Sequence, residues 1–265
     1  MNAMRFYKYR EVREDLTNDY AIKALFESYA VFSSRKNFND LFDSKIDIQY
    51  PPPEQILELQ LDPRIGNHAP FLDGWVEDGV FTPKGTLMLK NVETGLSEMF
   101  DSYALLSLSS HIDCPLLWAH YAASHTGFCI EFEFPRGNQP NKVKYREHIE
   151  SVPLLDFLKS MFQLSGVEFG ERVHDALLVK LNCWAYEGEY RWIANNEMGR
   201  VPKGERFIKV PYEATWVKAI IFGCRMPPDV KTHILERLPF STEFKQAIEG
   251  RDSIEVVPFD PRRHL

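Results

Sequence analysis

The stretch FCIEFEF at residues 128–134 carries the clearest secondary-structure signal in the chain. Phe128, Ile130, Phe132 and Phe134 occupy every second position, and a cysteine and two glutamates fill the positions between them. Successive side chains of a β-strand point to opposite faces of the sheet, so this alternation predicts a strand with one apolar face. The fold is therefore expected to contain a sheet that packs one face against a core.

The segments on either side of this strand predict a helix before it and a hairpin after it. The preceding segment PLLWAHYAASHTG (residues 115–127) starts with proline and ends with glycine, as helices often do. The following segment NKVKYR (residues 141–146) comes after a turn rich in Pro, Gly and Asn, which is typical of a β-hairpin. The middle of the chain thus combines helix and strand.

The rest of the chain continues this mixture. The segment from about 62 to 100 has many Gly, Pro and Asp residues and weak periodicity, which predicts an irregular insertion with one short helix. Hairpin-like spacing with interspersed helices favours an α+β fold, with a mixed, mainly antiparallel sheet and flanking helices in a single domain over 1–265. Strands are also predicted at 4–10, 103–110, 189–195, 205–212, 217–223 and 253–259, and helices at 20–30, 51–61, 153–164, 168–183, 227–238 and 242–250.

The composition is that of a folded protein, because 44% of the 265 residues are hydrophobic and only 26% are charged. A net charge of -7 disfavours nucleic acid as a general partner, although a local basic groove is compatible with that average. The four cysteines include no CxxC pair, and the N-terminal segment is charged without an apolar core, so we expect reduced thiols and no signal peptide. The apolar runs are far shorter than a membrane span, so a cytoplasmic protein without membrane contact is expected.

Several motifs with established chemistry are missing from the sequence. The chain has no GxxxxGK phosphate loop followed by Ser or Thr, no GxGxxG after a strand and no GxSxG nucleophile turn. His120 and His125 are five residues apart, about 140° around a helix, whereas a helical zinc site needs two ligands four residues apart. We therefore expect no dedicated metal site.

The first of three candidate clusters lies in the predicted helix 115–127 and contains Trp118, His120, Tyr121 and His125. On a helix, Trp118, Tyr121 and His125 fall on one stripe, which is typical of an amphipathic helix that packs aromatic residues into a core. The functional alternative makes Tyr121 and His125 the wall of a pocket for a planar ring or an oxygen-rich ligand. Trp118 and His120 would then lie beside that ligand.

The second cluster, WAYEGEYRW at residues 184–192, combines aromatic residues with Glu187, Glu189 and Arg191. In an extended chain these three charged residues share one face, and Tyr190 points the other way. One interpretation is a Glu–Arg pair on a sheet surface opposite a core stripe. In the other interpretation, one carboxylate stabilises developing positive charge in a cleft and the second activates a nucleophile, with the arginine orienting them.

The third cluster, SSRKNFND at residues 33–40, is typical of a turn with exposed basic residues. Functionally, Arg35 is a candidate for holding a phosphate through two hydrogen bonds, while Asn39 and Asp40 shape the loop. Arg10, at the end of the first predicted strand, is a further candidate ligand-binding arginine.

Four segments in this order resemble the bacterial family named domain of unknown function 2971 (DUF2971). They are FYKYR, SSRKNFNDLFD, SLSSHIDCPLLWAHYAASHTGFCIEF, and KLNCWAYEGEYRWI followed by VKAIIFG. The resemblance covers most of the chain, and WAHYAASHTGFCIEF is its most specific part. The family has no established reaction, so the resemblance implies a relationship but no activity.

A more distant resemblance is to ADP-ribosyltransferase-like folds. Those enzymes hold NAD with an Arg or His on an early strand, stack nicotinamide on an aromatic residue and place a Glu on a later strand. The resemblance implies these roles for Arg10, Tyr121 and Glu189, which occur in that order, with NAD as the substrate. The Glu187-Gly188-Glu189 spacing matches the carboxylate pair of arginine-directed members, and SLSS loosely matches their serine-rich strand.

Three functions follow as hypotheses. The first is an enzyme that cleaves NAD or transfers ADP-ribose, as a bacterial toxin or phage-defence effector with a nucleotide substrate. The second is a non-catalytic sensor or interaction domain that binds a protein partner through the 62–100 insertion. Catalysis is favoured if Glu189, Tyr121, His125 and Arg10 converge on one cavity, and the site assignment fails if they lie on different faces. The third is a nuclease-like enzyme that uses Arg35, Lys36, His120, His125 and Glu189.

Overall fold

The computed structural model describes residues 4–13, 15–149, 151–164, 167–194 and 198–265. Its contacts divide the chain into two compact units, each assembled from separate stretches of sequence. The sequence pattern predicts one domain, whereas the contacts define two units. Unit 1 comprises residues 1–33, 104–143 and 183–265, and unit 2 comprises residues 34–103 and 144–182.

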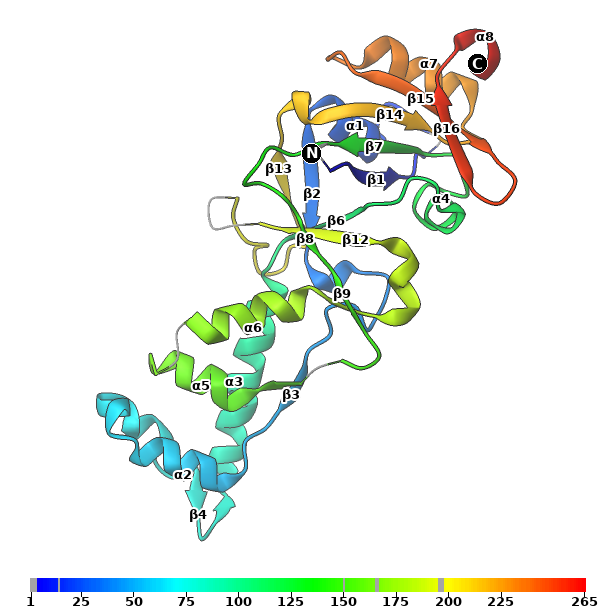
Figure 1. Cartoon of the computed structure of the whole chain (residues 1–265). Coiled ribbons are helices and arrows are strands. Elements are labelled where there is room, and N and C mark those ends of the chain that lie inside the picture. Colours follow the sequence, from blue (N-terminus) through cyan, green and yellow to red (C-terminus); the bar gives the residue numbers. More distant parts are fainter. Residues whose placement is uncertain (1–3, 14, 150, 165–166, 195–197) are drawn as a thin grey trace. The chain divides into compact units, whose positions relative to one another are not determined.

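Unit 1 is built on a sheet that contains ten strands among its described residues (Figure 1). Neighbouring strands are antiparallel, except that β14 and β15 are parallel and connected through α7. The predicted α+β class with a mixed, mainly antiparallel sheet and flanking helices is confirmed. The main path of the sheet runs through β13 (Phe207–Pro211), β2 (Tyr29–Ser33), β6 (Leu105–Ser109), β1 (Phe6–Arg10), β7 (Phe128–Phe132), β14 (Val217–Phe222), β15 (Glu243–Glu249) and β16 (Ile254–Pro258).

Two further strands and several helices complete unit 1. Strand β12 (Glu189–Ile193) pairs with β6, and β8 (Asn141–Lys142) pairs with β12. The helical segments are α1 (Tyr20–Phe26), α4 (Pro115–Tyr121), η3 (Asn182–Glu187), η4 (Ala214–Trp216), α7 (Pro228–Arg237) and α8 (Pro261–His264).

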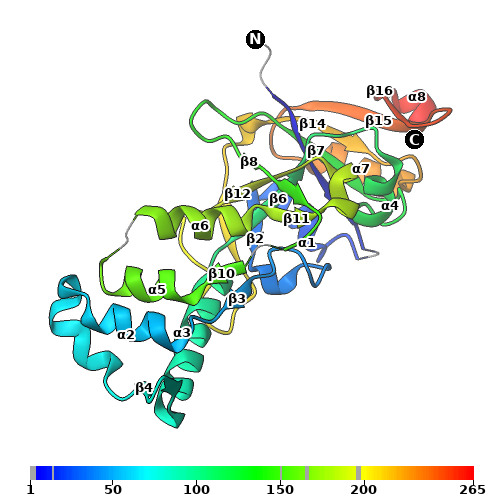
Figure 2. The same ribbon diagram turned by 60° about the horizontal axis from the view of Figure 1, so that its bottom comes forward.

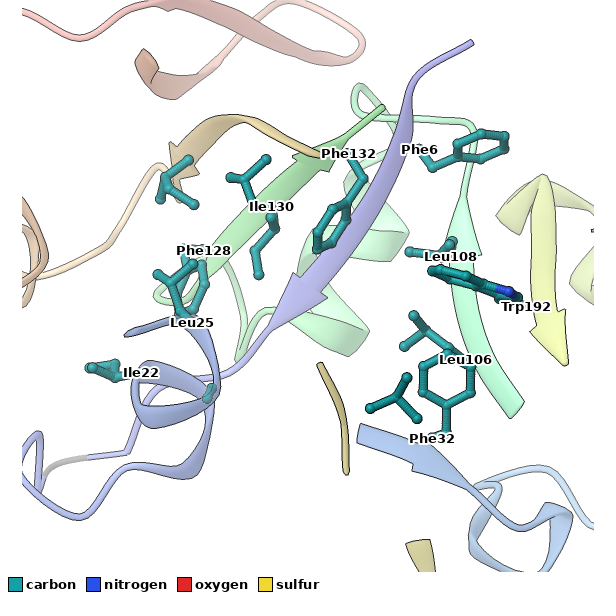
Figure 3. Packing of buried hydrophobic residues seen from close by; sticks show 14 of the residues in the cluster. Phe6, Ile22, Leu25, Phe32, Leu106, Leu108, Phe128, Ile130, Phe132 and Trp192 are labelled. Carbon is teal, nitrogen blue, oxygen red and sulfur yellow. The ribbon is translucent and has the colours of Figure 1, made fainter. Parts of the chain in front are cut away.

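Strand β7 keeps the alternation that its sequence predicts, but both of its faces are buried. Phe128, Ile130 and Phe132 pack in one core with apolar residues of α1, β1, β6 and β12, as Figure 3 shows. Cys129 belongs to a second core, which contains Trp118 of α4. The strand therefore lies in the middle of unit 1, with α1 on one side of the sheet and α4 on the other.

Strands β1 and β2 both pair with the same edge of β6 and run away from it in different directions. Strand β1 pairs with β6 through Tyr7 and Ser109, whereas β2 pairs with it through Ser33 and Leu105. The opposite edge of β6 is occupied along its length by β12. Strands β1 and β2 therefore diverge from β6, and the space between them is lined by side chains of these three strands and of α1.

Unit 2 is mainly helical, and α5 packs against α2, α3 and α6 (Figure 2). The parallel pair β3–β10 joins its two stretches of chain, and β9 pairs with β11 in the second stretch. Its elements are η1 (Arg35–Asn37), β3 (Asp47–Gln49), α2 (Pro53–Leu61), η2 (Pro63–Leu72), β4 (Val76–Glu77), β5 (Val80–Phe81), α3 (Pro83–Asp101), β9 (Lys144–Arg146), β10 (Ser151–Pro153), α5 (Leu154–Met161), α6 (Val167–Leu177) and β11 (Val179–Leu181).

The 62–100 segment is not irregular, contrary to the prediction. Helix α3 alone has 19 residues, and its N-terminus is capped by Thr82, whose hydroxyl accepts a hydrogen bond from the Gly85 backbone N–H (3.0 Å). The helix has only a narrow apolar stripe on an otherwise polar surface, and its glycines weaken the helical pattern in the sequence. The stripe consists of the buried residues Leu89, Val92, Leu96 and Phe100.

Three other local predictions are wrong because pairing with distant strands overrides local preference. The helix predicted over 242–250 is absent: residues 243–249 form β15 between β14 and β16, although Phe244, Ala247 and Ile248 have helical spacing. The predicted helix over 20–30 is cut short by β2. The predicted hairpin after β7 does not form, since β8 pairs with β12 and β9 with β11.

Candidate functional site

One group of the predicted residues comes together in unit 1. Glu189 on β12 is opposite Ser109 on β6, and Ser109 is opposite Tyr7 on β1. Cross-strand partners share a face, and Tyr9 on that face packs edge-to-face against a tryptophan of α4. The group therefore lies on the α4 side of the sheet. We call it the carboxylate site, and it consists of Tyr121, Glu187, Glu189 and Arg191.

Gly188 separates the two glutamates and forms the turn between η3 and β12. Its φ of 52° lies in the left-handed region, and a Cβ at this position would stand 2.3 Å from the His111 ring, so the turn requires glycine. The backbone N–H and the hydroxyl of Ser110 both donate to the Gly188 carbonyl at 3.0 Å. The Ser109 hydroxyl donates to the Glu187 carbonyl at 2.6 Å. The serines at the end of β6 thus fix the backbone from which both glutamates project.

Glu187 is 4% exposed and accepts a 2.5 Å hydrogen bond from the hydroxyl of Tyr121. This length is typical of a hydrogen bond from a hydroxyl to an ionised carboxylate. Tyr121 is the last residue of α4, so the bond ties the end of that helix to the turn before β12. It also fixes the orientation of the Glu187 carboxylate.

Glu189 and Arg191 form a buried ion pair. The Arg191 Nε donates to one carboxylate oxygen at 2.8 Å and its Nη2 donates to the other at 3.1 Å, while neither residue is more than 3% exposed. Two parallel hydrogen bonds of this kind match the planar guanidinium to the carboxylate. The predicted sharing of one face by Glu189 and Arg191 is therefore observed, and their charges balance each other.

Trp118 and His120 have structural positions beside this site. Trp118 is fully buried, and its Nε1 donates to the Ile112 carbonyl at 2.8 Å. This agrees with the core interpretation of the aromatic stripe. His120 is exposed, and its ring centroid is 6.3 Å from that of Tyr121.

His125 does not lie on the helix stripe that its spacing predicts. Helix α4 ends at Tyr121, and Ala123, Ser124 and His125 all have positive φ, at 45°, 54° and 73°. This left-handed turn leads directly into β7, and the His125 carbonyl accepts a hydrogen bond from the Arg225 N–H (3.0 Å). Burial, and then the charge of Arg225, lower the pKa of His125. The residue therefore belongs to the packing between α4 and the loop after β14.

Arg10 lies on the opposite side of the sheet from Glu189. It alternates with Tyr9 along β1, and it pairs with Phe128, whose side chain packs on the α1 side. Its guanidinium carbon stands 4.9 Å from the ring centre of Tyr20, which begins α1. The convergence of Arg10 with Tyr121 and Glu189 that the distant resemblance implies is thus not observed.

The third cluster lies in unit 2, where its residues hold the local chain. The Arg35 Nε donates to Asp101 at 2.8 Å and its Nη1 donates to the Ser44 carbonyl at 2.9 Å. Asp40 accepts a hydrogen bond from the Phe42 N–H (2.9 Å), and Asn39 is exposed. Asp40 shapes the loop as expected, whereas the guanidinium of Arg35 is already engaged by protein groups.

Three chemically important residues of unit 1 were not singled out from the sequence. Ser109 was visible only as part of SLSS, and its role depends on the register between β6 and β12. Lys8 lies within FYKYR, where its position between two tyrosines resembles a solvated strand face. Tyr212 follows β13 and had no motif around it. Lys8 and Tyr212 meet only because β1 and β13 belong to one sheet.

Similarity to known proteins does not identify a function for this chain. No family model matches the chain, and neither a curated protein nor a solved structure is significantly similar to it. The resemblance to DUF2971 therefore remains a prediction from the sequence. Within the described ranges, no three His, Cys, Asp or Glu residues gather as a metal site requires. In the same ranges, every helix is too short or too polar to cross a membrane.

Proposed function

We propose that this protein is an enzyme of the ADP-ribosyltransferase-like type, which cleaves the bond between nicotinamide and ribose in NAD. One observation carries the proposal. The serine-rich strand β6 lies between β1 and the glutamate-bearing strand β12, and Ser109 is opposite Glu189 in the register. The segments of Arg10, SLSS and Glu189, which the distant resemblance picks out along the chain, are therefore neighbouring strands of one sheet.

The chemistry of this reaction matches two differently held carboxylates. As the C–N bond breaks, its electron pair leaves with neutral nicotinamide, and positive charge develops on the ribose ring. The Glu189 carboxylate stabilises that charge, as carboxylates do in glycoside hydrolysis. Two of the hydrogen bonds to its oxygens come from Arg191 and hold the carboxylate in one orientation.

Glu187 then acts as the general base of the second step. It takes a proton from the nucleophile, which is water or a side chain of a target protein, while the nucleophile bonds to the ribose carbon. The hydroxyl of Tyr121 holds the carboxylate of Glu187 in place. Arg10 has no part in this proposal, because its side chain lies on the other side of the sheet.

Nicotinamide release from NAD tests the proposal. Purified protein, with and without lysate of its target cells as a source of acceptors, is incubated with NAD, and free nicotinamide is measured. We expect release, with Glu189→Gln lowering its rate by at least about a hundredfold, the scale of losing one electrostatic contact to a transition state.

Glu131→Gln is the matched control for that substitution. Glu131 is also a buried strand glutamate with a cationic partner, Lys245 (2.8 Å), but it lies on β7 outside the carboxylate site. Its substitution is expected to leave the rate of release within about twofold of the wild type. Two results would overturn the proposal: no nicotinamide release under either condition, or equal rates for folded Glu189→Gln and wild-type protein.

A further inference from the structure

The space between the diverging strands β1 and β2 is a pocket on the α1 side of the unit 1 sheet. Its enclosed volume is about 20 Å³, room for about one water molecule, and about 330 Å³ is empty when the open space at its mouth is included. Most of its wall is apolar and comes from α1, β2, β6 and β7, including Ala21, Leu25, Leu106, Ile130 and Phe132. We call it the cation pocket because of its polar residues.

Four residues with hydrogen-bond donors in their side chains line this pocket: Lys8, Arg10, Tyr29 and Tyr212. The Lys8 ammonium donates one hydrogen bond, to the Ser107 carbonyl at 2.8 Å, and an ammonium has three protons. The Arg10 Nη2 and the Tyr212 hydroxyl are buried and have no hydrogen-bond partner among the described residues. None of the described residues that line the pocket is Asp or Glu.

Two cations in an apolar wall without a lining carboxylate are unfavourable unless something else compensates them. The electrostatics agree with this expectation. Burial, and then the positive charge of Arg10, lower the pKa of Lys8 to about 8, although the more distant Glu189 and Glu187 act in the opposite direction. Among the described residues, the pocket wall therefore supplies donors and positive charge but no negatively charged side chain.

We propose that the cation pocket binds a small organic anion. One oxygen of a carboxylate or phosphate head enters the pocket and accepts hydrogen bonds from Lys8, Arg10 and Tyr212, and the apolar body of the anion lies at the open mouth of the pocket. This is a binding site separate from the proposed NAD chemistry, because it lies on the other side of the sheet from Glu189. It gives the sensor hypothesis a physical basis that does not require catalysis.

The proposal is tested by measuring, with titration calorimetry or NMR, how tightly four small molecules bind to the whole chain. The anions are benzoate, phenyl phosphate and inorganic phosphate, and benzamide is the neutral molecule of the same shape as benzoate. We expect one molecule of benzoate or phenyl phosphate to bind per chain, with benzamide at least about tenfold weaker, since charge-assisted hydrogen bonds are lost. Comparison of the two aromatic anions identifies the preferred head group, and inorganic phosphate shows what the apolar body adds.

Two substitutions assign that binding to the pocket. Arg10→Met is expected to weaken anion binding by about tenfold or more, and Tyr212→Phe by a smaller factor. Arg13→Met is the matched control, because Arg13 also stands over the Tyr20 ring (5.2 Å) but is exposed outside the pocket. It removes the same charge from the same neighbourhood and should leave the affinity unchanged.

Tyr212→Phe keeps the test valid if Arg10→Met does not fold, because it removes only a hydroxyl that has no partner. Three results would overturn the proposal. The first is that none of the three anions binds in the millimolar range. The second is that benzamide binds as well as benzoate, and the third is that Arg13→Met weakens binding as much as Arg10→Met or Tyr212→Phe does.

Discussion

On the α4 side of the unit 1 sheet, the charge of Arg191 is matched by Glu189, whereas on the α1 side Lys8 and Arg10 share a pocket that no described carboxylate lines. Both sides belong to the same strands, since Tyr7 and Lys8 are neighbours on β1 and point in opposite directions. The paired charges are complete within the protein fold. On the α1 side, the Arg10 Nη2 and the Tyr212 hydroxyl have no partner among the described residues. Charge balance, more than burial, therefore distinguishes the paired residues of the carboxylate site from the unpaired donors of the cation pocket.

The largest loss of stability is expected when the Glu189–Arg191 ion pair on the α4 side is broken. Arg191→Met would leave Glu189 buried without its main partner, and we expect the free energy of unfolding in urea to fall by about 3 to 5 kcal/mol. The double variant Glu189→Gln with Arg191→Met removes both charges and should lose clearly less stability than Arg191→Met alone. Equal losses of unfolding free energy in the two proteins would show that the unpaired charge of Glu189 does not cause the destabilisation.

On the α1 side, Lys8 makes the free energy of unfolding depend on pH. Its pKa is 10.5 in an unfolded chain and about 8 in the fold, so between these values the unfolded state binds more protons at this group. Stability from Lys8 is therefore lowest below pH 8 and rises as the pH increases toward 10.5, by up to about 3 kcal/mol.

A Lys8→Met variant isolates this contribution. Burial raises the pKa of Tyr9, Tyr20 and Tyr212, which lowers stability at high pH in both proteins and cancels in the difference. We expect the unfolding free energy of the wild type minus that of the variant to increase from pH 7 to 10.5. A flat or falling difference would mean that Lys8 is not destabilised by its pocket, and saturating benzoate should flatten the difference if the pocket binds it.

The turn that holds the two glutamates gives a smaller expected effect. Gly188→Ala adds a Cβ at a positive φ and close to the His111 ring, so we expect a loss of about 2 kcal/mol in unfolding free energy. Gly137→Ala is the matched control: its φ is also positive, but no atom lies within 4 Å of the added Cβ. If both variants lose the same stability, backbone strain alone explains the effect and the contact with His111 does not matter.

The smallest effects compare one tyrosine on each side of the sheet. Tyr121→Phe removes the hydrogen bond to Glu187 and should cost about 1.5 kcal/mol. Tyr212→Phe removes a buried hydroxyl without a partner, so stability in buffer free of organic anions should be unchanged or up to about 1 kcal/mol higher. Thermal and urea unfolding of both variants checks this. Equal destabilisation by the two substitutions would contradict the difference between the paired residues on the α4 side and the unpaired donors on the α1 side.

Much of the secondary structure could be predicted because its signals are local. The alternation over 128–134 identified β7, and the proline at the start of PLLWAHY identified α4. The failures occurred where distant pairing decides the outcome. Residues 243–249 have helical spacing of apolar residues, yet they form a strand because β14 and β16 offer hydrogen-bonding edges on both sides.

The candidate site, too, could be predicted only where its residues are close together in the chain. Glu189 and Arg191 are two residues apart in one strand, so their common face follows from the chain itself. The contact between Tyr121 and Glu187 joins residues 66 positions apart, and no pattern in the sequence predicted it. Arg10 was grouped with them by order along the chain, but order does not say which face of the sheet a residue occupies.

The sequence by itself determined the α+β class, the alternation within β7 and β12, and the pairing of Glu189 with Arg191, because each depends on residues that are close in the chain. Only the tertiary structure decided that Arg10 lies opposite that pair and meets Lys8 and Tyr212 in a pocket. The reason is physical. A strand fixes which residues alternate, but the side that faces a given helix is set by the register with strands far away in the sequence.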